Sequence, residues 1–467
     1  KQKTAYEMLR SLVGSEMCIR DRWRSQFNRL AFNFKNYFFR PHAVSFYSKL
    51  LSAERLEMEA LDILNWQKRQ DIVVFAFEHT AFYRKFYQAQ EIALEDLKRP
   101  ETFSRLPILT KNDIRSHFNE LIADTAHPAY YYRATTGGST GEPLTVLHDR
   151  RPPLETAAWR MMRWWDIEPS DDMAFIYRLR RKFPHNIIND IMWWPTRRIS
   201  LDASFMTADS MRDFLQRYES LKPAVLQGYT GAVYEFALFV RDNNLTITPP
   251  RAVWVTSAPL SDAQRTIMQT VYQAPVYDQY GSCEVMWLAA ECKERNGLHI
   301  NHDLRYIEFV DDAGKPVPDG EWGRILITDL ENKVFPLIRY EIGDRGRRLT
   351  RTCPCGITLP LMDKVRGRIT DVVRLPNGTV ISGEFLTTIF DDHPGAVNAF
   401  QVHQRVDFSI ILRCVPGKDP KAKEIIEKAH RNLQIKVGDA VPVTLEMVGH
   451  IPHDRGKTRF IISEVNR

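Results

Sequence analysis

The sequence predicts an α/β protein with a large multi-sheet N-terminal part and a small α+β C-terminal part. Its 467 residues exceed the roughly 250 to 300 residues at which one hydrophobic core usually stops growing, so at least two domains are expected. Between Pro128 and Gly367, short β-type segments alternate with helical stretches, which favours parallel strands joined through helices. Beyond Gly367 the pattern changes to hairpins and one amphipathic helix.

The chain from residue 23 to about residue 120 has a helical pattern. Apolar residues recur at three- and four-residue spacing from Arg55 to Phe86, as on one face of an amphipathic helix. A turn is expected at residues 106–113, where Thr110 can cap the helix that starts there.

Six β-type segments follow in the middle of the chain. The first four are separated by helical stretches and are expected to pair in parallel. The last two are bounded by turn sequences such as Asp311-Asp312-Ala313-Gly314 and are expected to form antiparallel hairpins. The segments are Met173 to Tyr177, Ala224 to Gln227, Ala252 to Thr256, Val276 to Tyr280, Ile307 to Val310 and Arg324 to Thr328.

A domain boundary is expected near Arg366 to Asp371, where residues 23–367 give way to residues 368–467. The second part has roughly 100 residues, which is within the usual size range of a domain. It is expected to begin with a hairpin that turns at Pro376-Asn377-Gly378, and Pro420 to Gln434 is expected to be a helix between strands.

Composition indicates a soluble cytoplasmic protein without a membrane span. No apolar run approaches the roughly 18 residues that cross a bilayer, and six cysteines over this length do not make a disulfide scaffold. Residues 1–22 lack the long apolar centre of a secretory signal. Their ending, Ser15 to Arg22, is typical of translated linker sequence, so we expect a non-native leader.

The net charge of +6 comes from interspersed basic and acidic residues, which argues weakly for anionic small ligands. Nucleic-acid binding is the weakest interpretation, because the basic residues form no patch interleaved with aromatic ones.

The most informative segment is a run of glycine and hydroxyl residues within Tyr131 to Pro143. The amides and hydroxyls of such a loop can surround phosphate oxygens. A Walker-type NTPase loop is excluded, because Glu142 stands where that motif needs its lysine. A run of this composition is also common in surface turns, so its interpretation depends on what lies downstream.

Four further motifs follow the loop in order: Tyr280-Gly281-Ser282-Cys283-Glu284, Arg339-Tyr340-Glu341-Ile342-Gly343-Asp344, Gly367-Arg368-Ile369-Thr370-Asp371 and Gly456-Lys457-Thr458-Arg459. Together with the loop they resemble the adenylate-forming ligases, specifically the phenylacetate-coenzyme A ligase family and its capsule-biosynthesis-associated branch. The resemblance covers about Leu106 to Arg459. It implies that residues 23–367 are an AMP-binding (adenylation) domain and that residues 368–467 are a mobile lid domain.

The resemblance implies that ATP and Mg²⁺ activate a carboxylic acid as an acyl adenylate, after which coenzyme A attacks it. This chemistry needs cations and amide donors, because two anions must meet and pyrophosphate must leave. By resemblance, Tyr280 would stack on adenine next to Gly281, and Glu284 would hold Mg²⁺. Asp344 would accept from the ribose hydroxyls. Arg368 would support the ribose or phosphate, and Lys457 would bridge the substrate carboxylate and the α-phosphate. Asp371 would be the hinge of the lid. The β- and γ-phosphates would be held by the loop residues Thr136, Gly137, Gly138, Ser139, Thr140 and Gly141.

The chain departs from many adenylate-forming enzymes at two positions. Glu142 replaces a lysine after the last loop glycine, so the loop would supply amides and hydroxyls without positive charge. Cys283 stands where threonine is usual and replaces a strong hydroxyl donor by a weak thiol donor. Both departures put the efficiency of phosphate contact in doubt. His185 and His393 are not needed as general bases, because a carboxylate requires none.

Three cysteines and one histidine predict a metal site. Cys292 precedes His299 by seven residues, and Cys353 and Cys355 belong to Cys-Pro-Cys-Gly. They could form a tetrahedral Cys₃His zinc site, which would be structural because it leaves no open position. Parts of the resembled family carry a structural metal here. The remaining cysteines, Cys18, Cys283 and Cys414, lie outside this set.

Neither the acid nor the acyl acceptor is specified by the sequence, and no residue set by itself specifies coenzyme A. An aryl or arylacetic acid is the family-level expectation, and a sugar-linked or amino acid carboxylate is the possibility in the capsule-associated branch. One alternative passes the acyl group to an amine or hydroxyl in surface polysaccharide or peptide assembly. Another is a nucleotide-binding scaffold without turnover, against which the joint presence of Glu284, Asp344, Arg368 and Lys457 argues.

Overall fold

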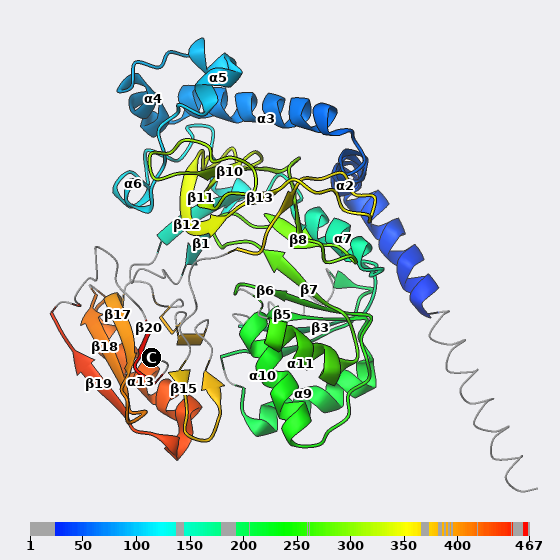
Figure 1. The fold of residues 1–467 in the computed structure, drawn as a ribbon, viewed down its shortest axis with the longest axis vertical. Helices are drawn as coiled ribbons and strands as arrows, with labels where there is room; N and C mark the ends of the chain where they lie inside the picture. Colours follow the sequence, from blue (N-terminus) through cyan, green and yellow to red (C-terminus); the bar gives the residue numbers. More distant parts are fainter. Residues whose placement is uncertain are drawn as a thin grey trace, which may run out of the picture.

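The computed structural model describes residues 24–136, 144–178, 193–204, 206–258, 260, 262–365, 373–381, 385–386, 389–390, 393, 396–417, 419–449, 451 and 461–465. Figure 1 shows a large body of helices and sheets, with a smaller module of C-terminal strands beside it. Within the described part of the chain, no helix combines the length and the apolar content that crossing a bilayer requires.

Helices make up the N-terminal part, as predicted. Residues 24–39 are helical. Thr80 separates α3 from α4 and caps α4, because its side-chain oxygen accepts from the backbone N–H of Tyr83. Thr110 caps α6 in a reciprocal capping box with Asp113, which confirms the predicted cap. The following elements are α2 (Pro41–Ala53), α3 (Met58–His79), α4 (Ala81–Gln88), η1 (Asp96–Lys98), α5 (Pro100–Phe103) and α6 (Lys111–Ser116).

A nine-stranded sheet forms the centre of the body, in the order β13-β14-β9-β8-β7-β6-β5-β3-β4. Its strands from β4 to β7 run parallel, and β8, β9, β14 and β13 continue the sheet in antiparallel pairs. The predicted parallel pairing is confirmed. The parallel strands are β3 (Met173–Tyr177), β4 (Arg198–Asp202), β5 (Val225–Tyr229), β6 (Ala252–Thr256) and β7 (Val276–Tyr280), and the others are β8 (Ala289–Glu291), β9 (Leu298–Ile300), β13 (Arg348–Leu349) and β14 (Leu361–Met362).

Both faces of the parallel strands are covered by helices (Figure 1). In β6, Val253 and Val255 pack with residues of α9–α11, while Ala252 and Trp254 pack with residues of α7. Successive side chains of a strand point to opposite faces, so an apolar run such as this one suits a strand buried on both sides. The helices are α7 (Glu155–Trp164), α9 (Ala208–Leu221), α10 (Thr230–Asp242) and α11 (Asp262–Tyr272).

Two smaller antiparallel sheets lie above the end of β7. The hairpin of β1 (Tyr131–Thr136) and β2 (Leu144–Asp149) flanks the glycine-rich loop, and its strands follow the short helix η2 (Pro128–Tyr130). The second sheet pairs β10 (Arg305–Val310), β11 (Gly323–Asp329) and β12 (Tyr340–Gly346), which confirms the predicted antiparallel pairing. Gly323 is required there, because a Cβ atom would meet the backbone nitrogen of Val310 at 2.7 Å.

The C-terminal module has its own core. The predicted hairpin is formed by β15 (Val373–Arg374) and β16 (Val380–Ile381), and a four-stranded sheet has the order β19-β18-β17-β20. Ile426 and Leu433 of the predicted helix, α13 (Ala422–Val437), are completely buried in this core. The proposed boundary lies at residues outside the described part and stays a prediction. The sheet consists of β17 (Val397–Gln404), β18 (Ile410–Pro416), β19 (Val443–Met447) and β20 (Ile461–Ser463), with η3 (Gly438–Ala440) before β19.

Candidate functional site

Two tyrosine–carboxylate hydrogen bonds connect the motif after β7 to β12. Tyr280 ends β7, and its hydroxyl donates to Asp344 Oδ2 at 2.9 Å. Tyr340 at the start of β12 donates to Glu284 Oε1 at 3.0 Å. Each motif therefore supplies one tyrosine and, four residues later, one carboxylate to the other motif. We call these four residues the crossed pairs.

The crossed pairs stand at the carboxyl ends of the parallel strands. In open α/β sheets, ligands bind outside this edge. Glu284 is buried, with 6% of its surface exposed, and the Tyr280 ring is half-buried. A buried carboxylate and an accessible aromatic ring at this edge could hold a cation and a planar ring.

The β1–β2 hairpin contacts the same motif. Nε2 of His148 in β2 donates to the backbone oxygen of Cys283 at 2.8 Å, and the Cys283 thiol lies 3.8 Å from the backbone oxygen of Thr135. Burial lowers the pKa of His148, so the ring is neutral and carries its proton on the nitrogen that donates. The hairpin thus brings the ends of the glycine-rich loop, Thr136 and Leu144, which are paired in register, toward the crossed pairs.

Several predicted site residues lie outside the described residues. They are Gly137, Gly138, Ser139, Thr140 and Gly141 of the loop, Arg368, the hinge residue Asp371, and Lys457. Their roles stay predictions. Thr136, Tyr280, Gly281, Glu284 and Asp344 are described, and all come from the hairpin, the end of β7 or β12.

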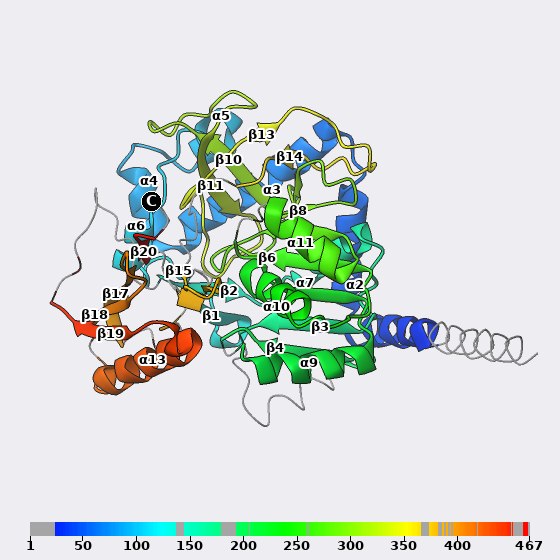
Figure 2. The ribbon, with the colours of Figure 1, turned by 60° about the horizontal axis from the view of Figure 1, so that its bottom comes forward.

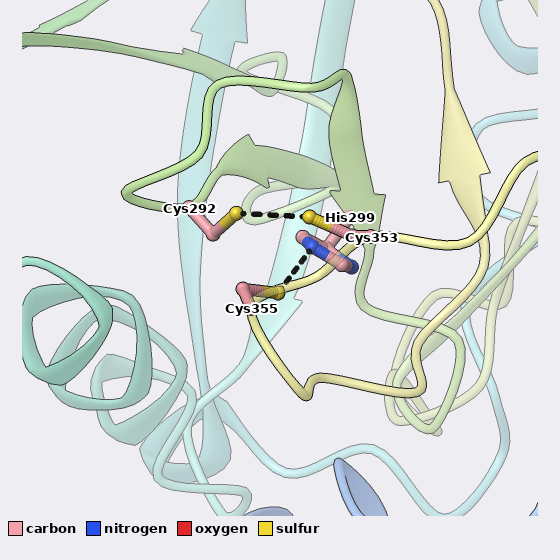
Figure 3. A group of neighbouring side chains, drawn as sticks. All are labelled: Cys292, His299, Cys353 and Cys355. Atoms are coloured by element: carbon pink, nitrogen blue, oxygen red, sulfur yellow. Dashed lines mark hydrogen bonds between the residues drawn. The ribbon is translucent and has the colours of Figure 1, made fainter.

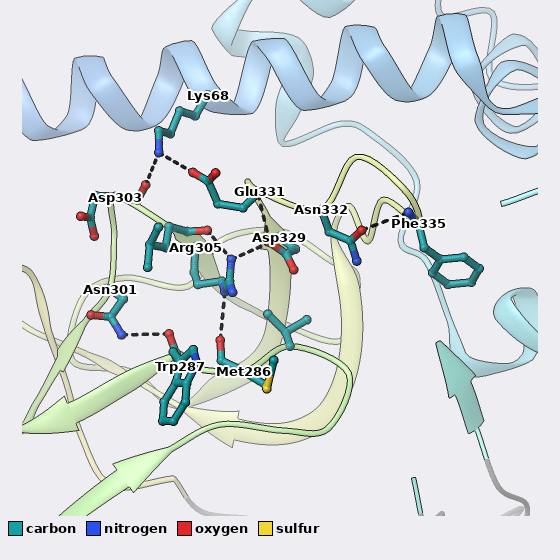
Figure 4. Close-up of polar contacts among 12 residues, drawn as sticks. Lys68, Met286, Trp287, Asn301, Asp303, Arg305, Asp329, Glu331, Asn332 and Phe335 are labelled. Carbon is teal, nitrogen blue, oxygen red and sulfur yellow. Dashed lines mark hydrogen bonds and ion pairs between the residues drawn. The ribbon is translucent and has the colours of Figure 1, made fainter. Parts of the chain in front are cut away.

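Buried polar side chains hold the loop after Glu284 in place (Figure 4). Arg305 Nε donates to the backbone oxygen of Met286 at 3.1 Å, and Asn301 Nδ2 donates to that of Trp287 at 2.9 Å. The Arg305 guanidinium also pairs with Asp329 at 2.5 Å, and both side chains are almost completely buried. Sequence reasoning missed this support. A signal for this pair was present: Arg305 begins the strand β10, and Asp329 ends the strand β11. The two residues lie opposite each other in the antiparallel pair.

We expect Arg305→Met to lower the free energy of unfolding by about 3–5 kcal/mol, because it leaves the buried Asp329 carboxylate without its partner. Urea denaturation measures this change. Arg217→Met removes an exposed pair with Asp213 and should cost less than about 1 kcal/mol. Equal losses in the two variants would contradict a supporting role of Arg305.

The predicted metal ligands meet at one place (Figure 3). One ligand atom each from Cys292, His299, Cys353 and Cys355 lies within 4.8 Å of the others. The Sγ atoms of Cys292 and Cys353 are 3.5 Å apart, and Cys355 Sγ lies 3.3 Å from His299 Nε2. In an ideal tetrahedral site with Zn–S bonds of about 2.3 Å, the sulfur atoms lie about 3.8 Å apart. The spacing fits such a site.

The surroundings of the cluster also suit a metal ion. His299 Nδ1 donates to the backbone oxygen of Leu359 at 3.0 Å, so Nε2 keeps its lone pair, as in metal-bound histidines. Burial raises the pKa of the Cys292 thiol and of the Cys355 thiol. Thiolates at this place therefore need a cation to offset the loss of hydration. Zinc binding remains a prediction that this geometry fits.

Comparisons with known proteins find relatives over most of the chain. Residues 373–464 match the family described as the CapK C-terminal domain. Protein CapK of Staphylococcus aureus is 22% identical over 414 residues, which are 85% of this chain and 88% of that protein. Phenylacetate-coenzyme A ligase of Thermus thermophilus is 22% identical over 440 residues, which are 86% of this chain and 96% of that protein.

A solved structure of 2-hydroxyisobutyryl-CoA ligase, in complex with 2-HIB-AMP and CoA in the thioesterification state, has the same fold. It superposes with a TM-score of 0.63 at 20% sequence identity and covers 88% of this chain and 92% of that one. The fold predicted from the sequence, a large multi-sheet α/β region with a small C-terminal domain, is therefore confirmed.

Proposed function

We propose that the chain, a relative of CapK and of the phenylacetate-coenzyme A ligases, activates a carboxylic acid with ATP as an acyl adenylate and transfers the acyl group to coenzyme A. The observation that carries this proposal is the set of crossed pairs at the carboxyl edge of the parallel sheet, joined there by the hairpin of the glycine-rich loop. The solved relative with the same fold holds an acyl adenylate and CoA, which supports both half-reactions.

In the first half-reaction, the described residues would hold the nucleotide. The Tyr280 ring would stack on adenine, and Asp344, fixed by the Tyr280 hydroxyl, would accept from the ribose hydroxyls. Glu284 would hold Mg²⁺, which when bound offsets the negative charge of the phosphates. Its carboxylate is held by the Tyr340 hydroxyl, so it is positioned before the nucleotide arrives.

Most of the remaining contacts would come from residues beyond the described ranges. The uncharged loop from Thr136 to Gly141 would contact the β- and γ-phosphates through amides and hydroxyls. Arg368 would contact the ribose or phosphate, and Lys457 the substrate carboxylate and the α-phosphate. We place Lys457 on a lid domain of residues 368–467 that turns about Asp371 against the adenylation domain of residues 23–367. The Lys436–Glu235 ion pair, 2.8 Å long, joins α13 to α10, and such a turn would break it.

For the substrate, an aryl or arylacetic acid is the first expectation, since the ligase relatives are phenylacetate-coenzyme A ligases. A sugar-linked or amino acid carboxylate is the second. In the second candidate function, an amine or hydroxyl in place of coenzyme A accepts the acyl group. The proposed lid of residues 368–467, which includes the segment that matches the CapK C-terminal domain, would present this acceptor.

ATP–pyrophosphate exchange tests the proposal. The purified chain is assayed with aryl, arylacetic, fatty, amino and sugar acids in the absence of coenzyme A. We expect exchange with at least one class of acid, because adenylation is reversible and does not need the acceptor. Adding coenzyme A should then yield a thioester, whereas an amine or hydroxyl acceptor would leave coenzyme A unconsumed. Bound ATP without exchange across the panel would point to the scaffold alternative.

A further inference from the structure

The helix of residues 24–39 turns its most apolar side away from the protein. Phe27, Leu30, Phe34, Tyr37 and Phe38 are between 58% and 71% exposed. Their three- and four-residue spacing places them on one side of the helix, which we call the outer face. In most surface helices such an apolar stripe faces the core.

The opposite side of this helix makes the contacts with the body. Asn28, Phe32 and Asn36 are buried there. The Phe32 ring packs against Trp159 of α7 at a centroid distance of 5.2 Å, and Asn36 Nδ2 donates to the backbone oxygen of Phe32 within the same helix. Figure 2 shows the helix at the edge of the molecule, where it extends past α2. The buried side of the helix therefore carries one aromatic ring and two amides, whereas the five large apolar side chains of the outer face are exposed to water.

The segment that carries the outer face is basic. Residues 24–53 contain five cations, Arg24, Arg29, Lys35, Arg40 and Lys49, and no aspartate or glutamate, although Arg40 pairs with Glu155 of the body. Arg24 and Arg29 lie 3.9 and 3.7 Å from carboxylates of the body, and their side chains are 45% and 62% exposed. Pairs as exposed as these are weak, so both guanidinium groups can also reach anions outside the protein.

An aromatic ring from another segment extends the outer face. Trp194 is 51% exposed and packs edge-on against Phe27 at 6.5 Å. Tryptophan and tyrosine are the side chains most suited to the boundary between lipid and water, because each combines a large apolar ring with a polar group.

We propose that the outer face binds the surface of an anionic lipid bilayer. The helix would lie in the plane of the interface, with its aromatic rings among the headgroups and its cations at the lipid phosphates. A second copy of this chain suits the face less well, because pairing two outer faces would bring the exposed guanidinium groups of Arg24 and Arg29 from both copies close together. This inference does not depend on the ligase function.

Vesicle co-sedimentation tests the inference with the full chain. We expect binding to vesicles that contain phosphatidylcholine and phosphatidylglycerol, and little binding to phosphatidylcholine alone. Raising the salt concentration to about 0.5 M should weaken binding, because the charges lie at the surface. The double variant Phe34→Gln and Phe38→Gln removes two rings without adding charge, and it should lower the bound fraction about tenfold or more.

The matched control is Val406→Gln with Ile435→Gln, which removes two side chains that are 70% and 63% exposed elsewhere. It should bind vesicles like the unchanged chain. Absence of vesicle binding, equal loss in both variants, or equal binding to neutral vesicles would overturn the inference. A second copy would be the occupant of the outer face if the unchanged chain bound no vesicles and formed a dimer in sedimentation equilibrium. The Phe34 and Phe38 substitutions would then abolish this dimer.

Discussion

We expect ATP–pyrophosphate exchange to fall about 100- to 1000-fold when Glu284 is replaced by glutamine, which is the usual effect of losing one preorganised charge at a reacting centre. Glutamine has nearly the same shape, and its amide oxygen can still accept from Tyr340, which holds Glu284 at 3.0 Å. The change therefore removes the negative charge and leaves the local structure in place. A magnesium titration of the exchange rate should show that the variant needs a higher metal concentration.

Glu341→Gln is the control for this experiment. Glu341 follows Tyr340 directly, but its side chain is 28% exposed and pairs with Arg324 at 2.7 Å, away from the crossed pairs. The exchange rate of this variant should stay within about twofold of that of the unchanged chain, because Glu341 pairs with Arg324 and not with a residue of the crossed pairs. A Glu284→Gln protein with normal exchange, or one whose loss of activity follows only from unfolding, would remove the proposed role of this carboxylate.

Cys353→Ser is expected to abolish stoichiometric zinc binding and to lower the midpoint of thermal unfolding by roughly 4 °C. A ligand present at a hundred times its dissociation constant adds about 2.7 kcal/mol to the folded state, and each kcal/mol moves the midpoint by about 1.4 °C in a domain as large as residues 23–367. The remaining thiols and His299 would stay buried without the cation that suits them. Metal analysis and calorimetry on the same preparation measure both effects.

Cys283→Ser serves as the matched thiol control, because Cys283 is exposed and is not one of the four clustered residues. Zinc content and midpoint should both stay unchanged in this variant. Removing zinc from the unchanged chain with a strong chelator should reproduce the shift seen for Cys353→Ser, which keeps the test valid if that variant folds poorly. Full zinc content in the Cys353→Ser protein would show that the cluster is not the binding site.

The parallel strands of the central sheet could largely be predicted, and its short antiparallel strands could not. The segments that became β3 and β6 are largely apolar runs of five residues, and those of β5 and β7 begin with apolar residues and follow helices, so local pattern and tertiary burial agree. Strands β8, β9, β13 and β14 have only two or three residues each, which is too few for any periodicity. Their position follows from pairing across the sheet and from the cysteine–histidine cluster beside them.

In the candidate site, too, part of the arrangement could be predicted from the sequence and part could not. Tyr280, Glu284 and Asp344 were predicted as site residues from motifs along the chain. The way they are joined was not predicted, because the two hydrogen bonds connect residues that are 64 and 56 positions apart in the sequence. Arg305 was missed for a related reason, since only the fold reveals that it lies beneath the loop after Glu284.

The cysteine–histidine cluster also bears on how a movement of the lid would affect the central sheet. Cys353 and Cys355 lie in the loop before β14, and Cys292 and His299 belong to the strands β8 and β9 or their ends. The chain then runs from β14 straight toward residues 366–371, where we place the pivot of the lid. An ion at the cluster would anchor that segment, so a swinging lid could not pull β14 off the sheet. The rotation would then be confined to the few residues beyond Lys364. Without an ion at the cluster, we expect the segment between β14 and the lid to become less rigid.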